Sequence, residues 1–260
     1  MPVSTALTIA GSDPSGGAGL QADLKTFHQH GVYGMAVVTL VTVQNTRSVT
    51  RVDVLEPALV RQQLEAVLSD IPPGAVKTGA LGNAAVISAV AEALRGQRAP
   101  LVVDPVMISK HGHPLLAAEA QGALVERLLP LTTLLTPNTH EAGALLGRPI
   151  TTLEEAEAAA RELAQRGPRA VLVKGGHLTG SEAVDVLFAE GMLTHFRAPR
   201  VETKHTHGTG CTYASAIAAG LALGKPLRTA IDDAKRWLTE ALKTAPGLGS
   251  GLGPVNHLAR

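Results

Sequence analysis

Short apolar runs rich in β-branched residues alternate along this chain with longer amphipathic runs rich in Ala and Leu. The runs that predict strands are Ala6–Ala10, Ala36–Val43, Ala75–Lys77, Leu101–Asp104, Thr133–Thr136 and Ala170–Lys174. The runs that predict helices are Leu20–His30, Ala58–Leu68, Ala84–Arg95, Gly122–Leu128, Glu154–Arg166, Cys211–Leu223 and Leu227–Lys243. Several strand runs are almost entirely apolar, as expected where helices cover both faces of a sheet. The alternation therefore predicts an α/β fold of three layers, with a mostly parallel central sheet flanked by helices.

The pattern changes between residues 184 and 196. Two short runs rich in strand-forming residues, Val184–Phe188 and Leu193–Phe196, are separated there by a turn that contains Gly191. Strand-forming residues on both sides of so short a turn predict an antiparallel hairpin, which we expect at an edge of the sheet. The sequence shows neither an internal repeat nor a convincing linker, so residues 1–260 are predicted to form a single domain.

Composition excludes several classes of protein. The formal net charge is +1 and aromatic residues make up 2% of the chain, so neither a basic surface nor stacking rings are available for nucleic acid. Cys211 is the single cysteine, which excludes an internal disulfide and favours a reducing compartment. No basic segment precedes the first apolar run, and no apolar run reaches the ~18 residues of a membrane span. We therefore expect a cytoplasmic protein with no nucleic-acid or membrane partner.

The strongest local signal is the segment His207–Thr212 (HGTGCT), which directly precedes a helix of small residues. Its two glycines, Gly208 and Gly210, allow a tight turn and leave backbone N–H groups uncovered. A helix that begins there directs its free N–H groups and its partial positive charge to one point. The segment therefore predicts an anion site for a phosphate or a transferring phosphoryl group. The alternative is an ordinary Gly-rich turn with a threonine as the helix cap.

A second Gly-rich loop, Gly11–Gly19 (GSDPSGGAG), lies between the first predicted strand and the first predicted helix. It is not a Walker A motif, because no Lys-Ser or Lys-Thr pair follows the glycines, and its spacing does not fit the dinucleotide-binding G-x-G-x-x-G. Ligands of open α/β sheets bind outside the carboxyl ends of the strands. A substrate loop is therefore the better interpretation, with a plain turn as the alternative.

Polar side chains also follow three later strands. Asp104 ends one strand run, Asn138 and Glu141 come just after another, and Lys174 ends a third. Carboxylate and amide oxygens suit Mg²⁺, and a lysine suits phosphates. The alternative is structural: Asn138 caps a helix, Glu141 completes a capping box, and Lys174 is a solvated strand end.

Seven segments together resemble the hydroxymethylpyrimidine kinases of the ribokinase-like superfamily. In chain order they are Ala10–Asp23 (AGSDPSGGAGLQAD), Val43–Thr46 (VQNT), Val76–Gly79 (VKTG), Asp104–Met107 (DPVM), Thr136–Glu141 (TPNTHE), Val173–His177 (VKGGH) and Thr206–Thr212 (THGTGCT). Each segment alone is weak evidence for the family. Together they occur in the family's order and are distributed along nearly the whole chain. The resemblance implies a ribokinase-like fold, a homodimer, ATP as co-substrate and Mg²⁺. It also implies two successive phosphorylations in thiamine biosynthesis, first of 4-amino-5-hydroxymethyl-2-methylpyrimidine and then of its monophosphate.

The resemblance assigns a substrate pocket. Asp23 and Gln44 are expected to hydrogen-bond the pyrimidine, whose exocyclic amino donor and ring-nitrogen acceptors suit a carboxylate and an amide. The further residues expected to line this pocket are Gly11, Ala18 and Val106.

At position 80 the chain departs from the family. The family reads Gly-Met-Leu where this chain has Gly79, Ala80 and Leu81. The family methionine is expected to pack on the pyrimidine, so Ala80 leaves room in the substrate pocket.

The resemblance also assigns the phosphoryl-transfer residues. Gly208, Thr209 and Gly210 correspond to the family's anion hole, and Cys211 takes the place of an aspartate base of the wider superfamily. A thiol at a helix N-terminus can have a lowered pKa and accept the hydroxyl proton. We also hypothesise that cysteine serves both steps, because a permanent carboxylate would repel the phosphate that is the nucleophile of the second step.

For ATP and its metal, the resemblance indicates two groups of residues. Lys174 and Lys235 are expected to approach ATP. The expected ligands of Mg²⁺ are Asn138 and Glu141, with Asp104 as a further candidate.

Two other functions remain open from the sequence. A pyridoxine or pyridoxal kinase of the same superfamily also phosphorylates a hydroxymethyl group on a flat heterocycle, although Gln44 with Asp23 favours the aminopyrimidine. A non-catalytic ligand-binding protein on the same fold is the other alternative, since a fold does not determine a function.

Overall fold

The structure, a computed structural model, describes residues 3–109, 112–117 and 119–260. The strands are β1 (Thr5–Ser12), β2 (Tyr33–Gln44), β3 (Val49–Val54), β4 (Ala75–Thr78), β5 (Leu101–Val103), β6 (Leu134–Leu135), β7 (Ala170–Val173), β8 (Glu182–Ala189) and β9 (Met192–Pro199). The α-helices are α1 (Gly19–Gln29), α2 (Pro57–Asp70), α3 (Ala84–Leu94), α4 (Ala120–Ala123), α5 (Thr139–Leu146), α6 (Leu153–Ala164), α7 (Thr209–Ala222) and α8 (Leu227–Lys243). A π-helical turn, η1 (Leu124–Leu128), and a 3₁₀ turn, η2 (Leu129–Leu131), continue α4.

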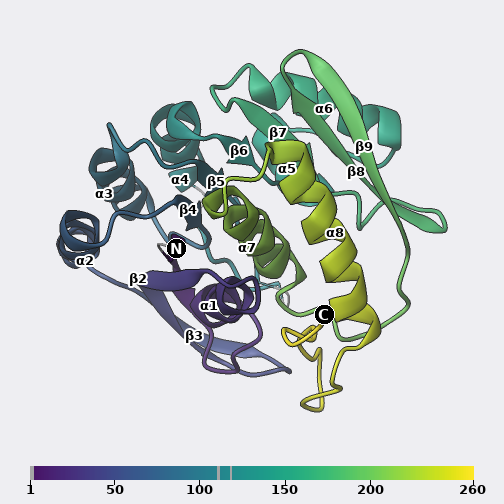
Figure 1. Ribbon diagram of the computed structural model, residues 1–260, viewed down its shortest axis with the longest axis horizontal. Helices are drawn as coiled ribbons and strands as arrows, with labels where there is room; N and C mark the ends of the chain where they lie inside the picture. Colours follow the sequence, from purple (N-terminus) through teal and green to yellow (C-terminus); the bar gives the residue numbers. More distant parts are fainter. Residues whose placement is uncertain (1–2, 110–111, 118) are drawn as a thin grey trace.

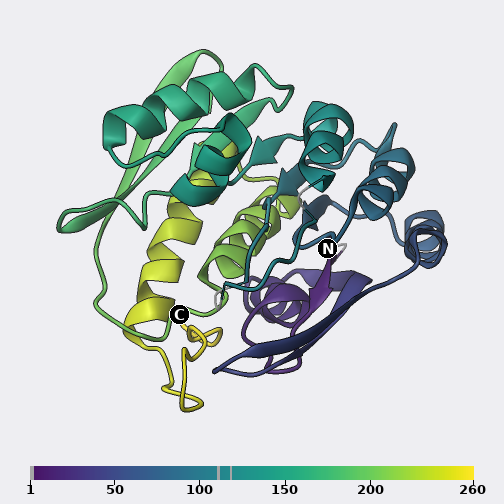
Figure 2. The ribbon, with the colours of Figure 1, turned by 180° about the vertical axis from the view of Figure 1, so that it is seen from behind.

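Within the described residues the strands form one nine-stranded sheet in the order β3-β2-β1-β4-β5-β6-β7-β8-β9. The central strands run parallel to one another; in sheet order they are β2, β1, β4, β5, β6 and β7. β3 is antiparallel to β2 at one edge, and β8 and β9 continue the other edge in antiparallel fashion. Helices cover both faces of the sheet (Figures 1 and 2). The predicted three-layer α/β fold with a mostly parallel sheet is confirmed.

Successive residues of the central strands point to opposite faces of the sheet and enter two separate apolar cores. Leu101 and Val103 pack in the core beneath α2, α3, α5 and α6, whereas Val102 packs in the core beneath α1, α7 and α8. Leu135 and Leu134 divide between the two cores in the same way. The continuous apolar runs of the sequence therefore reflect burial on both faces.

The predicted edge hairpin is also confirmed. β8 and β9 pair antiparallel along their whole length, from Glu182 opposite Pro199 to Ala189 opposite Met192. The two residues between the strands, Glu190 and Gly191, have φ of 52° and 76°, the backbone that a two-residue hairpin turn requires.

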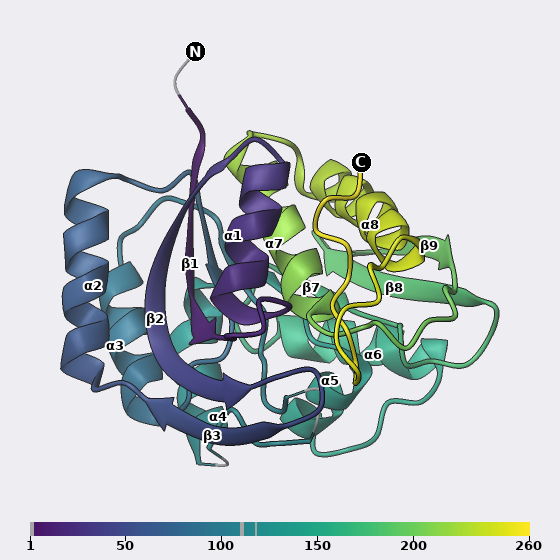
Figure 3. The same cartoon turned by 90° about the horizontal axis from the view of Figure 1, so that it is seen from below.

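Other elements differ from the sequence-based expectations. β3 was not predicted; it is an edge strand whose Thr50, Arg51 and Asp53 are exposed, so it lacks the apolar run of a buried strand. Figure 3 shows β2 and β3 as a long curved pair beside β1 and α2. The helix predicted at 122–128 is divided between α4 and η1, and the chain turns into η2 at Pro130, which cannot continue a helix interior.

The loops that follow β1, β5, β6 and β7 emerge at the carboxyl edge of the parallel sheet, where ligands of such sheets bind. The N-terminus of α7 meets these loops at the same edge, as their shared cavity shows. Among the described residues, no helix has both the length and the apolar character needed to cross a bilayer.

Candidate functional site

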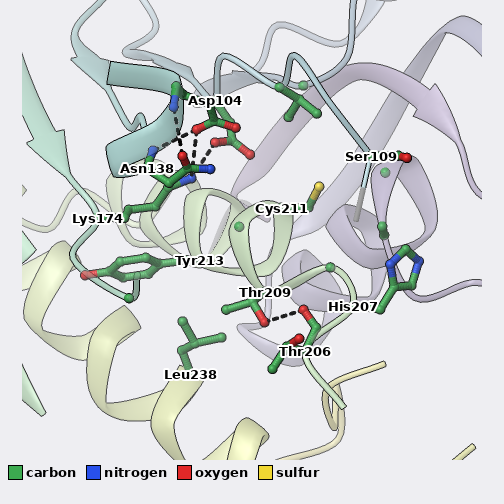
Figure 4. A pocket seen from close by; sticks show the side chains of 18 of the residues that line it. Asp104, Ser109, Asn138, Lys174, Thr206, His207, Thr209, Cys211, Tyr213 and Leu238 are labelled. Atoms are coloured by element: carbon green, nitrogen blue, oxygen red, sulfur yellow. Dashed lines mark hydrogen bonds and ion pairs between the residues drawn. The ribbon is translucent and has the colours of Figure 1, made fainter. Parts of the chain in front are cut away.

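A cavity of about 780 Å³ opens at this edge of the sheet, a size typical of sites for small molecules. Its walls come from the loops after β1, β4, β5, β6 and β7, from β2 and β8, from the segment between β9 and α7, and from α7 and α8. Figure 4 shows Asp104, Asn138 and Lys174 on one side of the first turn of α7 and His207 on the other. The predicted site residues that line the cavity are Gly11, Ala18, Gln44, Ala80, Asp104, Val106, Asn138, Glu141, Lys174, Gly208, Thr209, Gly210, Cys211 and Lys235.

The N-terminus of α7 has the backbone predicted for an anion site. Gly208 has φ of 76°, and a Cβ there would lie 1.7 Å from the carbonyl oxygen of Gly17, so only glycine fits. No side chain of the described residues caps the helix; the Thr209 hydroxyl instead donates to Thr206 O at 2.7 Å (Figure 4). Thr209 N–H donates to the same oxygen at 3.3 Å. The N–H groups of Gly208 and Gly210, which line the cavity, are therefore the donors that join the positive end of the helix dipole at this point.

Cys211, in the first turn of α7, lines the cavity and is half-buried. Desolvation raises the pKa of its thiol to about 11, which outweighs the opposing effect of the Lys77 ammonium and of a hydrogen bond from Gly19 N–H. The expectation that the helix N-terminus lowers this pKa is therefore wrong, because burial dominates over the helix dipole. Cys211 is a neutral thiol at neutral pH.

A charged cluster lies next to the anion site. Lys174 Nζ is 2.7 Å from Asp104 Oδ1 and 3.9 Å from Glu141 Oε2. A Cβ on Gly210 would lie 3.3 Å from Lys174 Nζ and 3.6 Å from Asp104 Oδ2, so this cluster adjoins the first turn of α7. Burial raises the pKa of Glu141 to about 7, against the attraction of Lys174. The pKa of Lys174 is raised, because attraction by Asp104 and Glu141 outweighs desolvation.

Asn138 and Glu141 also form the capping box that was the structural alternative. Asn138 Oδ1 accepts from Glu141 N–H at 2.9 Å, and Glu141 Oε2 accepts from Asn138 N–H at 2.7 Å. Among the described residues, no three His, Cys, Asp or Glu side chains are grouped to hold a metal alone. Mg²⁺ usually needs only one or two carboxylates, with waters and substrate phosphates as its other ligands, so Asp104 and Glu141 fit it.

Asp23 is not part of the cavity wall. Its side chain is fully buried, and its carboxylate accepts from Thr8 Oγ1 at 2.6 Å, from Ser215 Oγ at 2.5 Å and from Lys77 Nζ at 2.8 Å. The prediction that Asp23 hydrogen-bonds a substrate is therefore wrong, because packing turns the carboxylate toward a buried lysine. Lys77 was not singled out from the sequence, although it lies in the VKTG segment.

Lys235 lines the cavity, but its ammonium already has a partner. Lys235 Nζ lies 2.6 Å from Asp185 Oδ2, and Asp185 Oδ1 accepts from Gly175 N–H at 2.9 Å. The pair joins α8 to β8 and to the loop after β7. Lys235 therefore contributes to the cavity as one half of a buried ion pair.

At the opposite end of the cavity, Gln44 meets two residues that sequence reasoning did not select. Gln44 Nε2 lies 3.2 Å from His207 Nε2, and the same ring nitrogen lies 2.7 Å from Asp13 Oδ2. Asp13 and His207 both line the cavity and are each 3% exposed. The signal that marks them is their place in the two Gly-rich segments, which meet only in the folded chain.

Comparison with known proteins places this site in a family. Residues 13–256 match the phosphomethylpyrimidine kinase family. The hydroxymethylpyrimidine/phosphomethylpyrimidine kinase of Rhizobium meliloti is 50% identical over 261 residues, covering 98% of this chain and 97% of that protein. The thiamine biosynthesis bifunctional protein ThiED of Geobacter sulfurreducens is 51% identical over 258 residues, covering 99% of this chain and 53% of that protein. The chain therefore spans about half the length of ThiED.

Pyridoxal kinase from Staphylococcus aureus, solved in complex with AMP-PCP and pyridoxal, is similar in structure. The TM-score is 0.92 at 35% sequence identity, and the match covers 100% of this chain and 95% of that chain. The ribokinase-like fold expected from the resemblance is thereby confirmed. The match over residues 13–256, with relatives half identical to it in sequence, shows that the chain is a kinase that belongs to the phosphomethylpyrimidine kinase family.

Proposed function

We propose that this protein transfers the γ-phosphoryl group of ATP to the hydroxymethyl oxygen of 4-amino-5-hydroxymethyl-2-methylpyrimidine, and then transfers a second one to the monophosphate. The observation that carries the proposal is the open N-terminus of α7 between a charged cluster and a pocket around Gln44. One cavity thus offers a place for an anion, a place for a metal-bound polyphosphate and a place for a flat ring. This agrees with the family to which the chain belongs.

The anion hole stabilises the transferring group in this proposal. The backbone N–H groups of Gly208 and Gly210 are the proposed donors to the phosphoryl oxygens, which suits a reaction that depends on positioning and charge stabilisation. The N–H group of Thr209, which lies between them, donates to Thr206 O at 3.3 Å. Lys174, adjacent to Gly210, adds a positive charge at the same place. Lys235 neutralises Asp185 on the α8 side of the cavity and so reduces repulsion of the nucleotide phosphates.

Asp104 and Glu141 are the proposed carboxylate ligands of Mg²⁺, and Asn138 orients Glu141 through the capping box. The bound ion would neutralise phosphate charge, while Lys174 keeps the two carboxylates together before ATP binds. Hard oxygen donors at the edge of an anion site are the donor set that Mg²⁺ prefers.

Cys211 acts in this proposal as a thiol and not as a preformed thiolate. With a pKa of about 11, the thiol is ionised in about one molecule in ten thousand at pH 7. In the first step the acceptor oxygen forms its bond to the γ-phosphorus as the bond from that phosphorus to the bridging oxygen of ADP breaks, and a loose transition state demands little proton removal beforehand. The hydroxyl proton then passes to an oxygen of the transferred phosphoryl group and from there to solvent. The second step uses an ionised phosphate and needs no base. Cys211 therefore hydrogen-bonds the acceptor oxygen without adding a negative charge.

Gln44, Gly11, Ala18, Val106 and Ala80 form the proposed wall around the pyrimidine. The similarity to pyridoxal kinase makes pyridoxal the second candidate acceptor. A homodimer and a cytoplasmic location stay predictions from the sequence.

The experiment that tests the function is steady-state ATP turnover with Mg²⁺ and three acceptors: hydroxymethylpyrimidine, its monophosphate and pyridoxal. Turnover of both pyrimidines with poor turnover of pyridoxal is the expected result. Turnover of pyridoxal alone would show that the protein is a kinase but that its acceptor is not the pyrimidine. If none of the three supports turnover, the proposed substrates are wrong.

A further inference from the structure

We propose that Asp13 and His207 are positioning residues that turn the amide of Gln44 so that it offers an N–H donor to the cavity. The site then selects a heteroaromatic ring through an acceptor ring nitrogen and not through an exocyclic amino group. The inference deepens the proposed function and rests on it. Gln44 touches the substrate in this scheme, whereas Asp13 and His207 act through Gln44.

Asp13 accepts hydrogen bonds on both carboxylate oxygens. Oδ1 accepts from Ser15 N–H at 2.9 Å and from Ser15 Oγ at 2.7 Å. Oδ2 accepts from Gly17 N–H at 3.2 Å and from Ala18 N–H at 2.9 Å. Burial acts to raise the pKa of Asp13, but hydrogen bonds from His207 and Ser15 outweigh it and lower the pKa. Asp13 is therefore an ionised carboxylate, which can only accept hydrogen bonds.

The ionised state of Asp13 determines which nitrogen of His207 carries a proton. His207 Nε2 lies 2.7 Å from Asp13 Oδ2, and two acceptors cannot share so short a contact without a hydrogen between them. His207 Nε2 therefore bears hydrogen, whether the ring is neutral or charged. A nitrogen that bears hydrogen in the ring plane has no lone pair left to accept from Gln44.

The amide of Gln44 must match this donor. Its side-chain nitrogen lies 3.2 Å from His207 Nε2, a distance at which two N–H donors repel each other. The one hydrogen on Nε2 points mainly to Asp13 Oδ2. A half-turn of the amide therefore makes Oε1 the second, longer acceptor of a bifurcated hydrogen bond and directs the NH₂ group away from His207. Within the part of the chain that the structure describes, this side chain makes its hydrogen bond to His207, and Gln44 lines the cavity. The NH₂ group is then available to a ligand.

Packing holds His207 in this arrangement. A Cβ on Gly17 would lie 2.6 Å from His207 Cδ2, and a Cβ on Gly208 would lie 1.7 Å from Gly17 O. The two Gly-rich loops are therefore in direct contact, with His207 between Gly17 and Asp13. A ring so enclosed keeps its orientation, and the donor that it presents to Gln44 is fixed before a ligand binds.

The first experiment compares two substitutions of His207. His207→Gln keeps an N–H donor near the position of Nε2, whereas His207→Leu removes it. The measured quantity is the ratio of kcat/KM for hydroxymethylpyrimidine to kcat/KM for each of two pyridine analogues, in which one ring nitrogen is replaced by C–H. We expect the wild-type protein and His207→Gln to reject one analogue by about tenfold or more, the effect of an unpaired buried N–H. His207→Leu should retain less than about a third of that ratio, while rejection of the des-amino pyrimidine stays at its wild-type level.

A second variant tests the donor directly and does not depend on the folding of the His207 variants. Gln44→Glu keeps the size of the side chain and an oxygen for His207, but it presents an acceptor to the ring nitrogen. We expect kcat/KM for hydroxymethylpyrimidine to fall by about thirtyfold or more, mainly through KM. Wild-type activity in Gln44→Glu would overturn the inference. So would a kcat/KM ratio that is the same in His207→Leu as in the wild-type protein, or one that falls equally in His207→Gln and His207→Leu. Absence of wild-type turnover on both pyrimidines would instead reject the proposed function and this inference with it.

Discussion

At the scale of single residues, environment decides chemistry that residue type alone leaves open. Cys211 follows a glycine at a helix N-terminus, a setting that lowers the pKa of many cysteines. Its pKa is nevertheless raised to about 11, because the cavity wall removes the thiol from water and Asp23 and Asp104 contribute negative charge nearby. The same position therefore holds a neutral group, which a phosphate can approach without repulsion.

This neutral position makes a prediction about the two steps of the reaction. Cys211→Asp places a charge near the acceptor oxygen, and the second acceptor is itself an anion. We expect the substitution to reduce kcat/KM for the monophosphate about tenfold more than kcat/KM for hydroxymethylpyrimidine, because two like charges at contact distance repel by a few kcal/mol. Cys211→Asn, of the same size and uncharged, is the control and should affect both steps alike. If Cys211→Asp lowered kcat/KM equally for the two acceptors, measured separately, the hypothesis would be contradicted.

At the scale of elements, one buried ion pair joins four of them. Asp23 lies on α1, and its carboxylate receives hydrogen bonds from Thr8 on β1, Lys77 on β4 and Ser215 on α7. All four residues are fully buried, so every donor and acceptor depends on its partner. Ser215 is one turn beyond Cys211, and the pair thereby anchors the beginning of α7 to the centre of the sheet.

Removal of one partner tests this anchor. Lys77→Met leaves Asp23 buried without a counter-charge, and we expect the free energy of unfolding to fall by about 3–5 kcal/mol in urea denaturation at pH 7. The matched control is Lys243→Met, at an exposed lysine paired with Glu240. This substitution should change the free energy of unfolding by less than about 0.5 kcal/mol. The double substitution Lys77→Met with Asp23→Leu should recover part of the loss. A loss in Lys77→Met no larger than in Lys243→Met would show that the pair does not hold these elements.

At the scale of the whole molecule, distant segments close the site together. Asp13 and His207 are 194 positions apart and yet share a hydrogen bond of 2.7 Å. The C-terminal segment joins the same region, since His207 N–H donates to Gly253 O at 3.1 Å and Leu252 N–H donates to Thr46 O at 2.8 Å. The substrate end of the cavity is therefore assembled from the first loop, the end of β2, the start of α7 and the C-terminal segment.

This long-range contact predicts how stability depends on pH. The pKa of Asp13 is lowered in the folded state, so its contribution is fully present above the unfolded pKa of about 3.9 and is lost as pH falls through the lower folded-state value. We expect Asp13→Asn to cost about 1–3 kcal/mol at pH 7 and the difference from wild type to shrink below about pH 4. Urea denaturation of both proteins from pH 7 to pH 3 measures this difference in the free energy of unfolding. Asn in place of the exposed Asp53 is the control substitution. A difference that stays constant down to pH 3 would contradict a lowered pKa for Asp13.

Local patterns in the sequence determined the layers of this protein, the hairpin of β8 and β9, the two Gly-rich loops and the family, because periodicity and backbone preference are properties of neighbouring residues. They also predicted that Asn138 and Glu141 can form a capping box, which spans only four positions. The tertiary structure alone decided that Asp23 faces Lys77 and not the cavity, that burial raises the pKa of Cys211, and that Asp13 and His207 meet at Gln44. Each of these depends on which groups lose water and which distant partner replaces it, and burial and partner are settled only when the helices pack on the sheet.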